Sequence, residues 1–441
     1  MANEQLMGKI VSLAKRRGFV YQGSEIYGGL AGTWDYGPFG HELRSNIERL
    51  WWKRFVSDRD DMYGISSSII MPEPVWQASG HLQGFTDPMT ECEKCKRRFR
   101  VDLLEDRVTC PECGGKLGTE KTFNLLFPIE MGSAVGGTVT AYLRGEVAQG
   151  MFVNFKNIID SFHPKLPFGI AQIGKAFRNE INPRDFLFRV REFDLMEFEY
   201  FIRENEWETQ FEYWRGEMWK WIDEIGLSRD HVHELEVSAE DRAHYSKRTI
   251  DFEYDFPFGR KELYGLAYRT DYDLKKHTEA SGVDLTYRDE STGETFIPHV
   301  IEPTFGAGRT VFAVLYEHYR EDELGGEKRA YLALPPVLAP VKVAVFPLLK
   351  NKPELVKKAR EVYQAVRKEI PQTAWDDNGN IGKRYRRQDE IGTPACVTID
   401  FDTLEDDAVT VRDRDTGAQE RISIGELTAY LKRTIVNEAL L

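Results

Sequence analysis

The sequence predicts an α+β protein, in which a large domain with an antiparallel sheet carries a zinc-ribbon-like insertion and precedes a smaller α/β domain. Residues 168–201 read as two extended runs joined by a polar loop, which is typical of an antiparallel hairpin. Closely spaced cysteine pairs within residues 90–118 indicate the insertion. Strands and helices alternate from about Leu338 onward, which indicates a small α/β unit. We therefore expect one domain over residues 1–337 and another over residues 338–441.

Composition and charge are those of a soluble globular protein. The chain has 441 residues, 41% hydrophobic and 30% charged, which suggests about two to three domains. It has no apolar run of about 18 residues and no signal-peptide pattern, so we expect no membrane contact and a cytoplasmic location. The net charge of −13 argues against nucleic-acid binding by bulk electrostatics. Residues 383–387 form a local basic patch that could bind RNA or could be a solvated loop.

The N-terminal elements follow from periodicity. Residues 3–17 read as an amphipathic helix, and the glycine- and aromatic-rich residues 24–40 as a structured loop. Residues 41–56 place their apolar side chains on one helical face. Residues 65–71 read as a strand that ends at Pro72.

The insertion carries a candidate metal site. Two Cys-x-x-Cys pairs supply four soft ligands, which tetrahedral Zn²⁺ prefers, and a full thiolate set leaves no open position for catalysis. We therefore expect structural zinc; free thiols or disulfides are the alternatives. The predicted ligands are Cys92, Cys95, Cys110 and Cys113.

The hairpin carries the candidate chemistry. Its first run holds Phe177, Arg178 and Glu180, and its loop spans residues 181–187. If the second run is a strand, a period of two puts six side chains on one face. Guanidinium groups suit phosphate, a ring suits a base, and carboxylates suit an amine, although a surface hairpin with salt bridges is the alternative. The six are Arg189, Arg191, Phe193, Leu195, Glu197 and Glu199.

The later elements complete the two domains. Residues 205–224 form a helix with an apolar stripe that we expect in the core. Residues 297–317 read as a strand, a glycine-rich turn, Arg309 and a helix whose N-terminus favours anions. We expect Cys396 to be buried. The C-terminal domain should contain strands at 341–348, 395–400, 408–412 and 421–424 and helices at 353–370 and 425–437.

Several of these stretches resemble a known family. The words FRNE and RVREF, separated by a loop, resemble motif 2 of the class II aminoacyl-tRNA synthetases, and residues 297–317 resemble motif 3. Six further segments resemble the homodimeric glycyl-tRNA synthetases. They are SEIYGG, VWQASGH, RFRVD, LRGEVAQGMFVNFKN, ELYGLAYRTDYDLKKH and NGNIGKRYRRQDEIGTP. The resemblance implies a class II synthetase sheet, an anticodon-binding domain, a homodimer, and ligation of glycine to tRNA(Gly) through a glycyl-adenylate, using ATP and Mg²⁺.

The resemblance also implies roles for individual residues. Arg178, Glu180, Arg189 and Arg309 would be catalytic, and Glu262 would bind magnesium. The ATP site would comprise Arg178, Asn179, Glu180, Phe188, Arg189, Val190, Arg191, Glu192, Phe193, Glu262, Leu263, Gly306, Ala307, Gly308 and Arg309. The glycine site would comprise Arg100, Glu146, Phe193, Asp194, Leu195, Met196, Glu197, Glu302, Thr304 and Gly306.

Three positions depart from the family pattern. Gly145 stands where proline is usual, Val147 where threonine is usual, and Thr304 where serine is usual. These departures leave open a related ligase that uses another small amino acid or an acceptor other than tRNA. A catalytically silent RNA-binding or regulatory module is a further alternative, which the complete set of arginines in motifs 2 and 3 disfavours.

Overall fold

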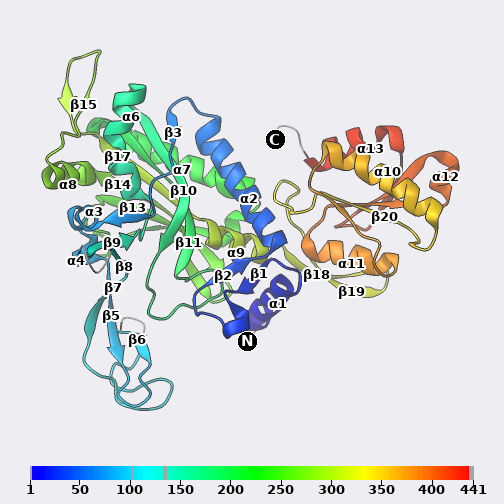
Figure 1. The fold of residues 1–441 in the computed structure, drawn as a ribbon, viewed down its shortest axis with the longest axis horizontal. Coiled ribbons are helices and arrows are strands. Elements are labelled where there is room, and N and C mark those ends of the chain that lie inside the picture. The colour runs from blue at the N-terminus through cyan, green and yellow to red at the C-terminus, as the bar shows by residue number, and fades with distance from the viewer. Residues whose placement is uncertain (1, 102–103, 133–136, 437–441) are drawn as a thin grey trace.

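The computed structural model describes residues 2–101, 104–132 and 137–436, whose elements fall into a larger and a smaller group (Figure 1). The larger group surrounds a seven-stranded sheet of order β12–β13–β14–β17–β11–β10–β3. Neighbouring strands run antiparallel apart from β10 and β3, which confirms the predicted sheet type. The strands are β3 (Met62–Gly64), β10 (Phe168–Phe177), β11 (Glu192–Ile202), β12 (Val232–Glu236), β13 (Arg248–Phe256), β14 (Gly259–Thr270) and β17 (His299–Gly306).

Helices and short strands surround this sheet. The hairpins β1–β2 and β15–β16 lie apart from it. The helices are α1 (Ala2–Arg16), α2 (Pro38–Trp52), α3 (Glu73–Ala78), α4 (His81–Gly84), α5 (Ala148–Phe152), α6 (Phe155–Phe162), α7 (Trp207–Glu224), α8 (Tyr272–Ser281) and α9 (Ala307–Glu317). The short strands are β1 (Val20–Gln22), β2 (Trp34–Tyr36), β15 (Tyr287–Arg288) and β16 (Thr295–Phe296), and single turns of other helix types span Glu25–Tyr27, Lys53–Ser57, Glu204–Glu206 and Arg229–His231.

The two faces of the large sheet differ in character. Helices α2, α7 and α9 cover one face with an aromatic core, in which the rings of Phe198 and Trp214 lie 4.6 Å apart and those of Trp51 and Phe305 lie 5.9 Å apart. Phe198 lies on β11 and points into this core. Odd-numbered residues of β11 therefore face the other side, where the candidate site lies.

The hairpin β10–β11 confirms the central prediction with one correction. Its register pairs Phe168 with Phe201 and Phe177 with Glu192. The first strand ends at Phe177 and the second begins only at Glu192, so Arg178, Glu180, Arg189 and Arg191 lie in the loop and not on the strands. Asp185 and Phe186 both have positive φ, 61° and 59°, which interrupts the extended backbone.

Only the end of the strand predicted at residues 65–71 is present. The structure has β3 and then β4 (Ile70–Pro72), with an irregular segment between them. Side-chain hydrogen bonds, and not the backbone ladder of a strand, hold that segment in place. Gln172 Oε1 accepts from the backbone N of Ser67 at 3.2 Å and from its Oγ at 2.8 Å. The guanidinium of Arg144 donates to the carbonyl of Ser67 at 3.0 Å.

The helix predicted from residue 41 begins earlier, at Pro38. Proline is favoured at the first helical position because its fixed φ suits the helix and its missing N–H is not needed there. The loop predicted over residues 24–40 is correspondingly shorter, and it includes the short strand β2.

Two three-stranded antiparallel sheets extend the larger group. In the first, β5 (Thr86–Glu91) pairs with β6 (Arg98–Arg100) and with β7 (Lys121–Asn124), and this module projects downward in Figure 1. In the second, β9 (Val139–Leu143) lies between β4 and β8 (Phe127–Met131). No helix among the described residues is long and apolar enough to cross a membrane.

The smaller group, on the right in Figure 1, contains a five-stranded sheet of order β21–β20–β22–β23–β24. Strand β20 runs parallel to β21 and β22, whereas β23 and β24 are antiparallel. Its core includes Val345, Val362 and Val397. The elements are β20 (Val343–Pro347), α10 (Pro353–Glu369), β21 (Thr373–Trp375), α11 (Ile381–Ile391), β22 (Ala395–Ile399), α12 (Asp402–Asp406), β23 (Ala408–Asp413), β24 (Gln419–Ser423), α13 (Ile424–Leu431) and a π turn (Lys432–Val436).

The basic stretch at residues 383–387 is a helix and not a loop. It belongs to α11, which begins where Asn380 accepts from the backbone N of Lys383 at 2.9 Å. Arg384 is only 1% exposed, and its guanidinium donates to the Gly379 carbonyl at 2.8 Å. Arg387 pairs with Asp376. The stretch is therefore not a uniformly exposed cationic patch. Cys396 is buried, as predicted.

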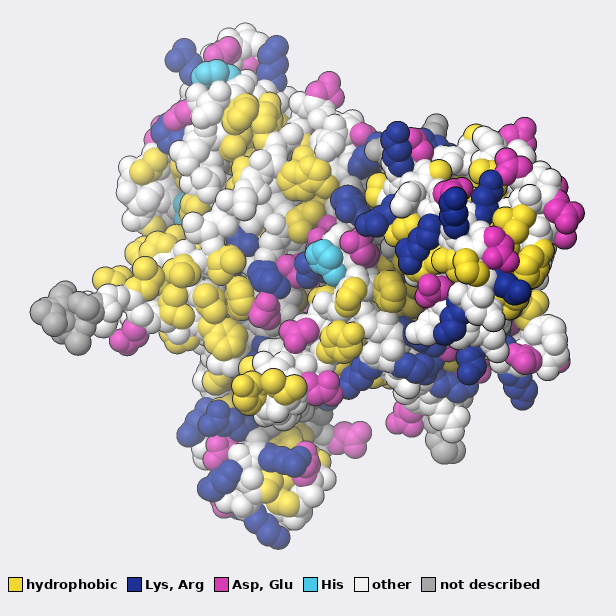
Figure 2. All heavy atoms as spheres, turned by 45° about the vertical axis from the view of Figure 1, so that its right-hand side comes forward, with side chains coloured by type: hydrophobic (Ala, Val, Ile, Leu, Met, Phe, Trp, Pro, Cys, Tyr) yellow, Lys and Arg dark blue, Asp and Glu magenta, His cyan; other side chains and the backbone are white. Residues whose placement is uncertain are grey.

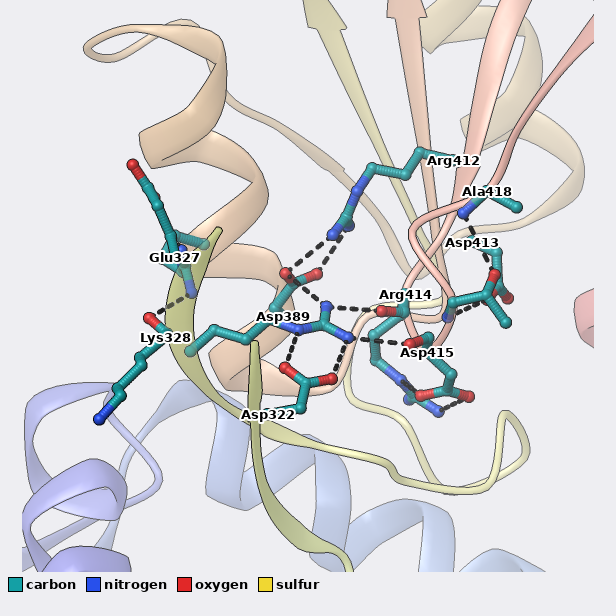
Figure 3. A network of polar contacts seen from close by, with 12 residues as sticks. Asp322, Glu327, Lys328, Asp389, Arg412, Asp413, Arg414, Asp415 and Ala418 are labelled. Atoms are coloured by element: carbon teal, nitrogen blue, oxygen red, sulfur yellow. Dashed lines mark hydrogen bonds and ion pairs between the residues drawn. The ribbon is translucent and has the colours of Figure 1, made fainter. Parts of the chain in front are cut away.

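A buried ionic network joins the hairpin β18–β19 to the smaller group (Figure 3). The hairpin of β18 (Tyr319–Leu324) and β19 (Glu327–Leu332) carries Arg329, whose guanidinium is 1% exposed. It donates to Asp322 at 2.7 Å and to Asp389 of α11 at 3.0 Å. Arg412 of β23 also donates to Asp389, at 2.8 Å. Two buried arginines from different elements thus share one carboxylate, which fixes α11 against this hairpin.

Candidate active site

A cavity of about 380 Å³ lies where β11, β14 and β17 meet the hairpin loop. Strand β17 pairs with both of its neighbours here, Thr304 lying opposite Glu197 on one side and Gly265 on the other. Side chains from adjacent strands therefore converge on one spot. The lining residues are Arg100, Arg178, Glu180, Leu187, Phe188, Arg189, Val190, Phe193, Asp194, Leu195, Lys261, Glu262, Leu263, Thr304, Gly306, Gly308 and Arg309.

Arg178 stands at the end of β10, with its guanidinium between two aromatic rings. The group lies 5.0 Å from the ring centre of Phe85 and 5.2 Å from that of Phe193. Its Nε donates to the carbonyl of Gly145 at 3.1 Å. Ring contacts and one hydrogen bond thus orient the cation and leave its terminal nitrogens free of any hydrogen bond among the described residues.

A chain of alternating charges forms one wall. Arg189 Nε donates to Glu180 Oε2 at 2.7 Å, and its terminal nitrogen lies 3.8 Å from Asp87. Asp87 also pairs with Arg100 at 2.8 Å. Since Asp87 lies on β5 and Arg100 on β6, the cysteine-bearing module contributes directly to this wall.

Arg309 lies on the opposite side, in the first turn of α9. Its guanidinium is 3.0 Å from Glu262 Oε2 and 4.5 Å from the ring centre of Phe188. The charge of Arg309 lowers the pKa of Glu262. The predicted glycine-rich turn is absent as such, because β17 runs straight into α9. A Cβ at Gly306 would come no closer than 3.5 Å to Arg309, so the protein alone does not require glycine there.

Buried carboxyl groups lie behind Thr304, and we call Glu146, Glu197, Glu199 and Glu302 the acidic cluster. None of the four lines the cavity, and each is at most 8% exposed. Thr304 Oγ1, which borders the cavity, donates to Glu197 Oε1 at 2.6 Å. Thr304 therefore links the cavity wall to the acidic cluster.

The members of the acidic cluster differ in partners. Fully buried Arg269 donates to Glu302 at 2.6 Å and to Asp273 at 2.8 Å. Neither oxygen of Glu199 has a hydrogen-bond partner among the described residues, and burial raises its pKa well above the usual range. Burial and the nearby Glu146 raise the pKa of Glu197 to about 7. The cluster thus combines ionised and proton-bearing groups next to a single fixed cation.

Several predicted site residues turn away from the cavity. Met196 and Ala307 are fully buried in the aromatic core, so each can offer a ligand only its backbone. Glu192 pairs with Lys175 at 2.8 Å. Arg191 donates to the carbonyl of Ala31 at 2.7 Å and thereby braces the N-terminal loop.

Two further side chains on the predicted lists also lie elsewhere. Asp194 borders the cavity, but its carboxylate accepts from Arg44 of α2 at 2.9 Å, because even-numbered positions of β11 face the helical side. Asn179 is outside the set of lining residues, and its backbone N donates to the carbonyl of Leu125 at 2.8 Å. The remaining predicted residues lie in the cavity wall or in the acidic cluster.

Sequence reasoning missed four groups that shape the site: His81, Asp87, Gln149 and Arg269. Each has at least one partner that is distant in sequence, Gln149 for example donating to Asp273 at 2.9 Å and Arg269 to Glu302 at 2.6 Å. No local pattern marks such residues. For Arg269 a signal did exist, since an arginine placed within an apolar strand is rarely buried without a carboxylate partner.

The four cysteines of the insertion come together. Their sulfurs all lie within 4.8 Å of one another, with Cys92 and Cys113 at 3.5 Å and Cys95 and Cys110 at 3.7 Å. Bonds of about 2.3 Å to a tetrahedral Zn²⁺ require sulfur separations of about 3.8 Å. None of the four is in a disulfide. A Cβ on Gly115 would approach Cys92 Sγ at 3.1 Å, so this tight turn favours glycine.

Comparisons with known proteins agree along the chain. Residues 140–319 match the family "tRNA synthetase class II core domain (G, H, P, S and T)", and residues 342–434 match "Anticodon binding domain". A glycine–tRNA ligase of Clostridium acetobutylicum is 48% identical over 465 residues, covering 99% of this chain and 100% of the relative. Glycine–tRNA ligases of Thermobifida fusca and Streptomyces coelicolor are 48% and 49% identical, covering 98% and 97% of this chain and 98% of each relative.

Proposed function

Because this chain belongs to the glycine–tRNA ligases, with a class II synthetase core and an anticodon-binding domain, we propose that the cavity binds ATP and that the acidic cluster binds glycine. The chain ligates glycine to tRNA(Gly) at the expense of ATP. A glycine carboxylate oxygen attacks the α-phosphorus, the bond to the β-phosphate breaks, and pyrophosphate leaves. A ribose hydroxyl of the tRNA 3′ end then attacks the carbonyl carbon of glycyl-adenylate, and AMP leaves.

The observation that supports this assignment of sites is the contact between two zones of opposite charge. Arginines line the cavity, and carboxyl groups lie immediately behind Thr304. ATP brings negative charge to the first zone, and the ammonium group of glycine brings positive charge to the second. The zones meet where the carboxylate of glycine must reach the α-phosphate.

In this arrangement Arg178 binds the α-phosphate, and Arg189 and Arg309 bind the outer phosphates. Phe193 stacks on adenine, and Glu180 accepts a hydrogen bond from its amino group. Catalysis then consists of positioning and charge neutralisation, which attack on a phosphoryl centre requires more than covalent help. Mg²⁺ usually takes one or two carboxylates together with phosphates, and Glu262 beside Arg309 fits that donor set. When bound, the ion neutralises charge on the triphosphate.

Glycine recognition in this proposal uses Glu146, Glu197 and Glu302 for the ammonium group. These acids are at most 8% exposed and are reached past Thr304, so larger side chains find no room. Thr304 stands where serine is usual in the family, and its additional methyl group narrows the path to these acids further.

Glycine affinity should depend on pH. With a pKa raised to about 7, Glu197 carries a proton at lower pH and becomes a carboxylate as the pH rises through that value. The KM for glycine in ATP–pyrophosphate exchange should therefore fall as the pH rises through about 7, while the KM for ATP stays level. Replacing Glu197 by Gln should remove this inflection. An unchanged pH profile in that variant would show that another group titrates.

We propose further that the four clustered cysteines bind a structural zinc ion. Sulfur spacing, the absence of disulfides and the complete thiolate set support it. Zinc would lock the module that holds Asp87 and Arg100 in the cavity wall.

We propose also that the chain forms a homodimer through an apolar strip on the β4–β9–β8 sheet. Ile70, Met131 and Val139 share one side of this sheet and are 45%, 47% and 68% exposed. Figure 2 shows hydrophobic side chains gathered in the left half of that view. Exposed apolar surface of this kind marks interaction sites.

Sedimentation tests the dimer. The chain should sediment as a dimer at micromolar concentration, and Val139→Asp should shift it towards the monomer, because a carboxylate in an apolar interface loses its hydration. The matched control is Leu404→Asp, at a position 43% exposed in the other domain, which should leave the dimer intact. A monomeric wild-type chain would refute the proposal.

Charging of tRNA tests the function directly. Labelled glycine should become acid-precipitable on tRNA(Gly) in the presence of ATP and Mg²⁺, and a tRNA for another amino acid should remain uncharged. Charging of neither, with a folded chain, would contradict the assigned activity.

A further inference from the structure

Glu146 differs from the other members of the acidic cluster because both of its oxygens accept from fixed donors. Oε2 lies 3.1 Å from His81 Nε2, and Oε1 accepts from Gln149 Nε2 at 3.0 Å. By contrast, Glu197 Oε2 and both oxygens of Glu199 have no hydrogen-bond partner among the described residues. One carboxylate of the four is therefore oriented by the protein from both sides.

His81 is itself held rigidly. It opens the short helix α4, is 4% exposed, and stands between the rings of Trp76 and Phe85, whose centres lie 5.4 Å and 5.3 Å away. The backbone around it is fixed as well, because Asn124 Nδ2 donates to the carbonyls of His81 and Leu82, both at 3.0 Å.

Each ring nitrogen of His81 faces a different polar side chain. Ser79 Oγ lies 2.8 Å from Nδ1, and the carboxylate of Glu146 faces Nε2. A carboxylate only accepts, so Nε2 carries a proton that faces Glu146. His81 thus links Ser79 to Glu146 through its two ring nitrogens.

We propose that His81 is a positioning residue for the glycine site, which holds the Glu146 carboxylate in place for the ammonium group of the substrate. The proposal rests on the proposed role of Glu146 and goes beyond it. His81 itself touches no substrate, because Glu146 stands between it and the rest of the acidic cluster.

Burial of Glu146 favours its protonated form, and His81 opposes that effect. Burial alone would raise the pKa of Glu146, but His81, Arg269 and Gln149 hold it well below its usual range. The other groups that act on this region are Glu197, Glu302, Asp273 and Tyr245. Among these charged groups the acids outnumber the single Arg269, so loss of the His81 donor should let Glu146 take up a proton.

His81→Leu keeps the apolar bulk and removes the donor. In ATP–pyrophosphate exchange its KM for glycine should rise about 10- to 100-fold, while the KM for ATP stays within about twofold. The ratio of this KM to the wild-type KM should be largest at low pH and should shrink as the pH rises, because Glu146 regains its charge. His81→Gln, which can place an amide N–H near the same position, should restore most of the affinity.

The outcomes distinguish failure of the positioning role from failure of the proposed ligand or of the proposed function. Equal rises in both KM values, or a KM ratio that does not change with pH, would overturn the positioning role and indicate a general structural defect, which the melting temperature would reveal. An unchanged KM in His81→Leu would also overturn it. A Glu146→Gln variant with a normal KM for glycine would instead refute the proposed ligand, and a wild-type chain without glycine-dependent exchange would refute the proposed function.

Discussion

Replacing Arg178 by Ala should reduce glycine-dependent ATP–pyrophosphate exchange by about 100- to 1,000-fold or more. The guanidinium is fixed between Phe85 and Phe193 and lines the cavity next to the acidic cluster. Its charge would be needed most as the α-phosphorus gains a fifth oxygen ligand. The variant should therefore lose mainly the rate at saturating substrates, with a smaller change in the KM for glycine.

The matched control is Arg184→Ala. Arg184 lies in the same hairpin loop, pairs with its neighbour Asp185 at 3.3 Å and does not line the cavity. Because exchange needs no tRNA, this variant should retain nearly full exchange activity. An Arg178→Ala enzyme within tenfold of wild type would contradict the role of this residue at the α-phosphate.

Replacing Cys110 by Ser should abolish zinc binding and strongly reduce exchange. Structural zinc supplies much of the folding energy of small cysteine modules, about 10–16 kcal/mol in peptides. Strands β5 and β6 of this module carry Asp87 and Arg100, which pair at 2.8 Å in the cavity wall. Loss of the module should therefore disturb the position of Arg189 as well.

Metal analysis of the purified chain measures this effect. Wild type should carry about one zinc ion per chain, and Cys110→Ser close to none. Cys396→Ala is the control, because Cys396 is buried in the smaller domain and takes no part in the sulfur cluster. Zinc-free wild-type protein with full activity would refute the structural metal.

How far the sequence predicts the structure depends on how local each signal is. Two extended runs joined by a polar loop predict β10 and β11, and a strand followed by a helix predicts β17 and α9, because each pattern lies within one stretch. The start of β11 was missed because the residues before Glu192 continue the alternation, while positive φ at Asp185 and Phe186 breaks the strand.

The highly charged composition of residues 381–391 conceals a helix. Helix α11 has the sequence IGKRYRRQDEI, in which Arg384 is buried against backbone carbonyls and Asp389 is shared by two arginines. A basic run of this kind reads as a solvated surface, because burial of arginine depends on acceptors that fold in from elsewhere.

The residues of the site likewise fall into those that a short motif marks and those that only the fold brings together. That the arginines of motifs 2 and 3 line one cavity was predictable, since a short motif marks each of them. The network His81–Glu146–Gln149–Asp273 was not, because its members come from three separate segments of the chain. Period two on β11 did mark Glu199, but only the fold shows that both of its oxygens are buried without partners among the described residues.

The most direct test of the account is amino-acid-dependent ATP–pyrophosphate exchange without tRNA, using glycine, alanine, serine, threonine and proline in turn. We predict exchange with glycine alone, since the proposal places the ammonium group of glycine at the buried acidic cluster behind Thr304, where a side chain would have to be buried as well. Exchange that favours alanine or serine would contradict the proposed pocket. No exchange with any of them, in folded, zinc-loaded protein with Mg²⁺, would contradict the adenylate chemistry itself.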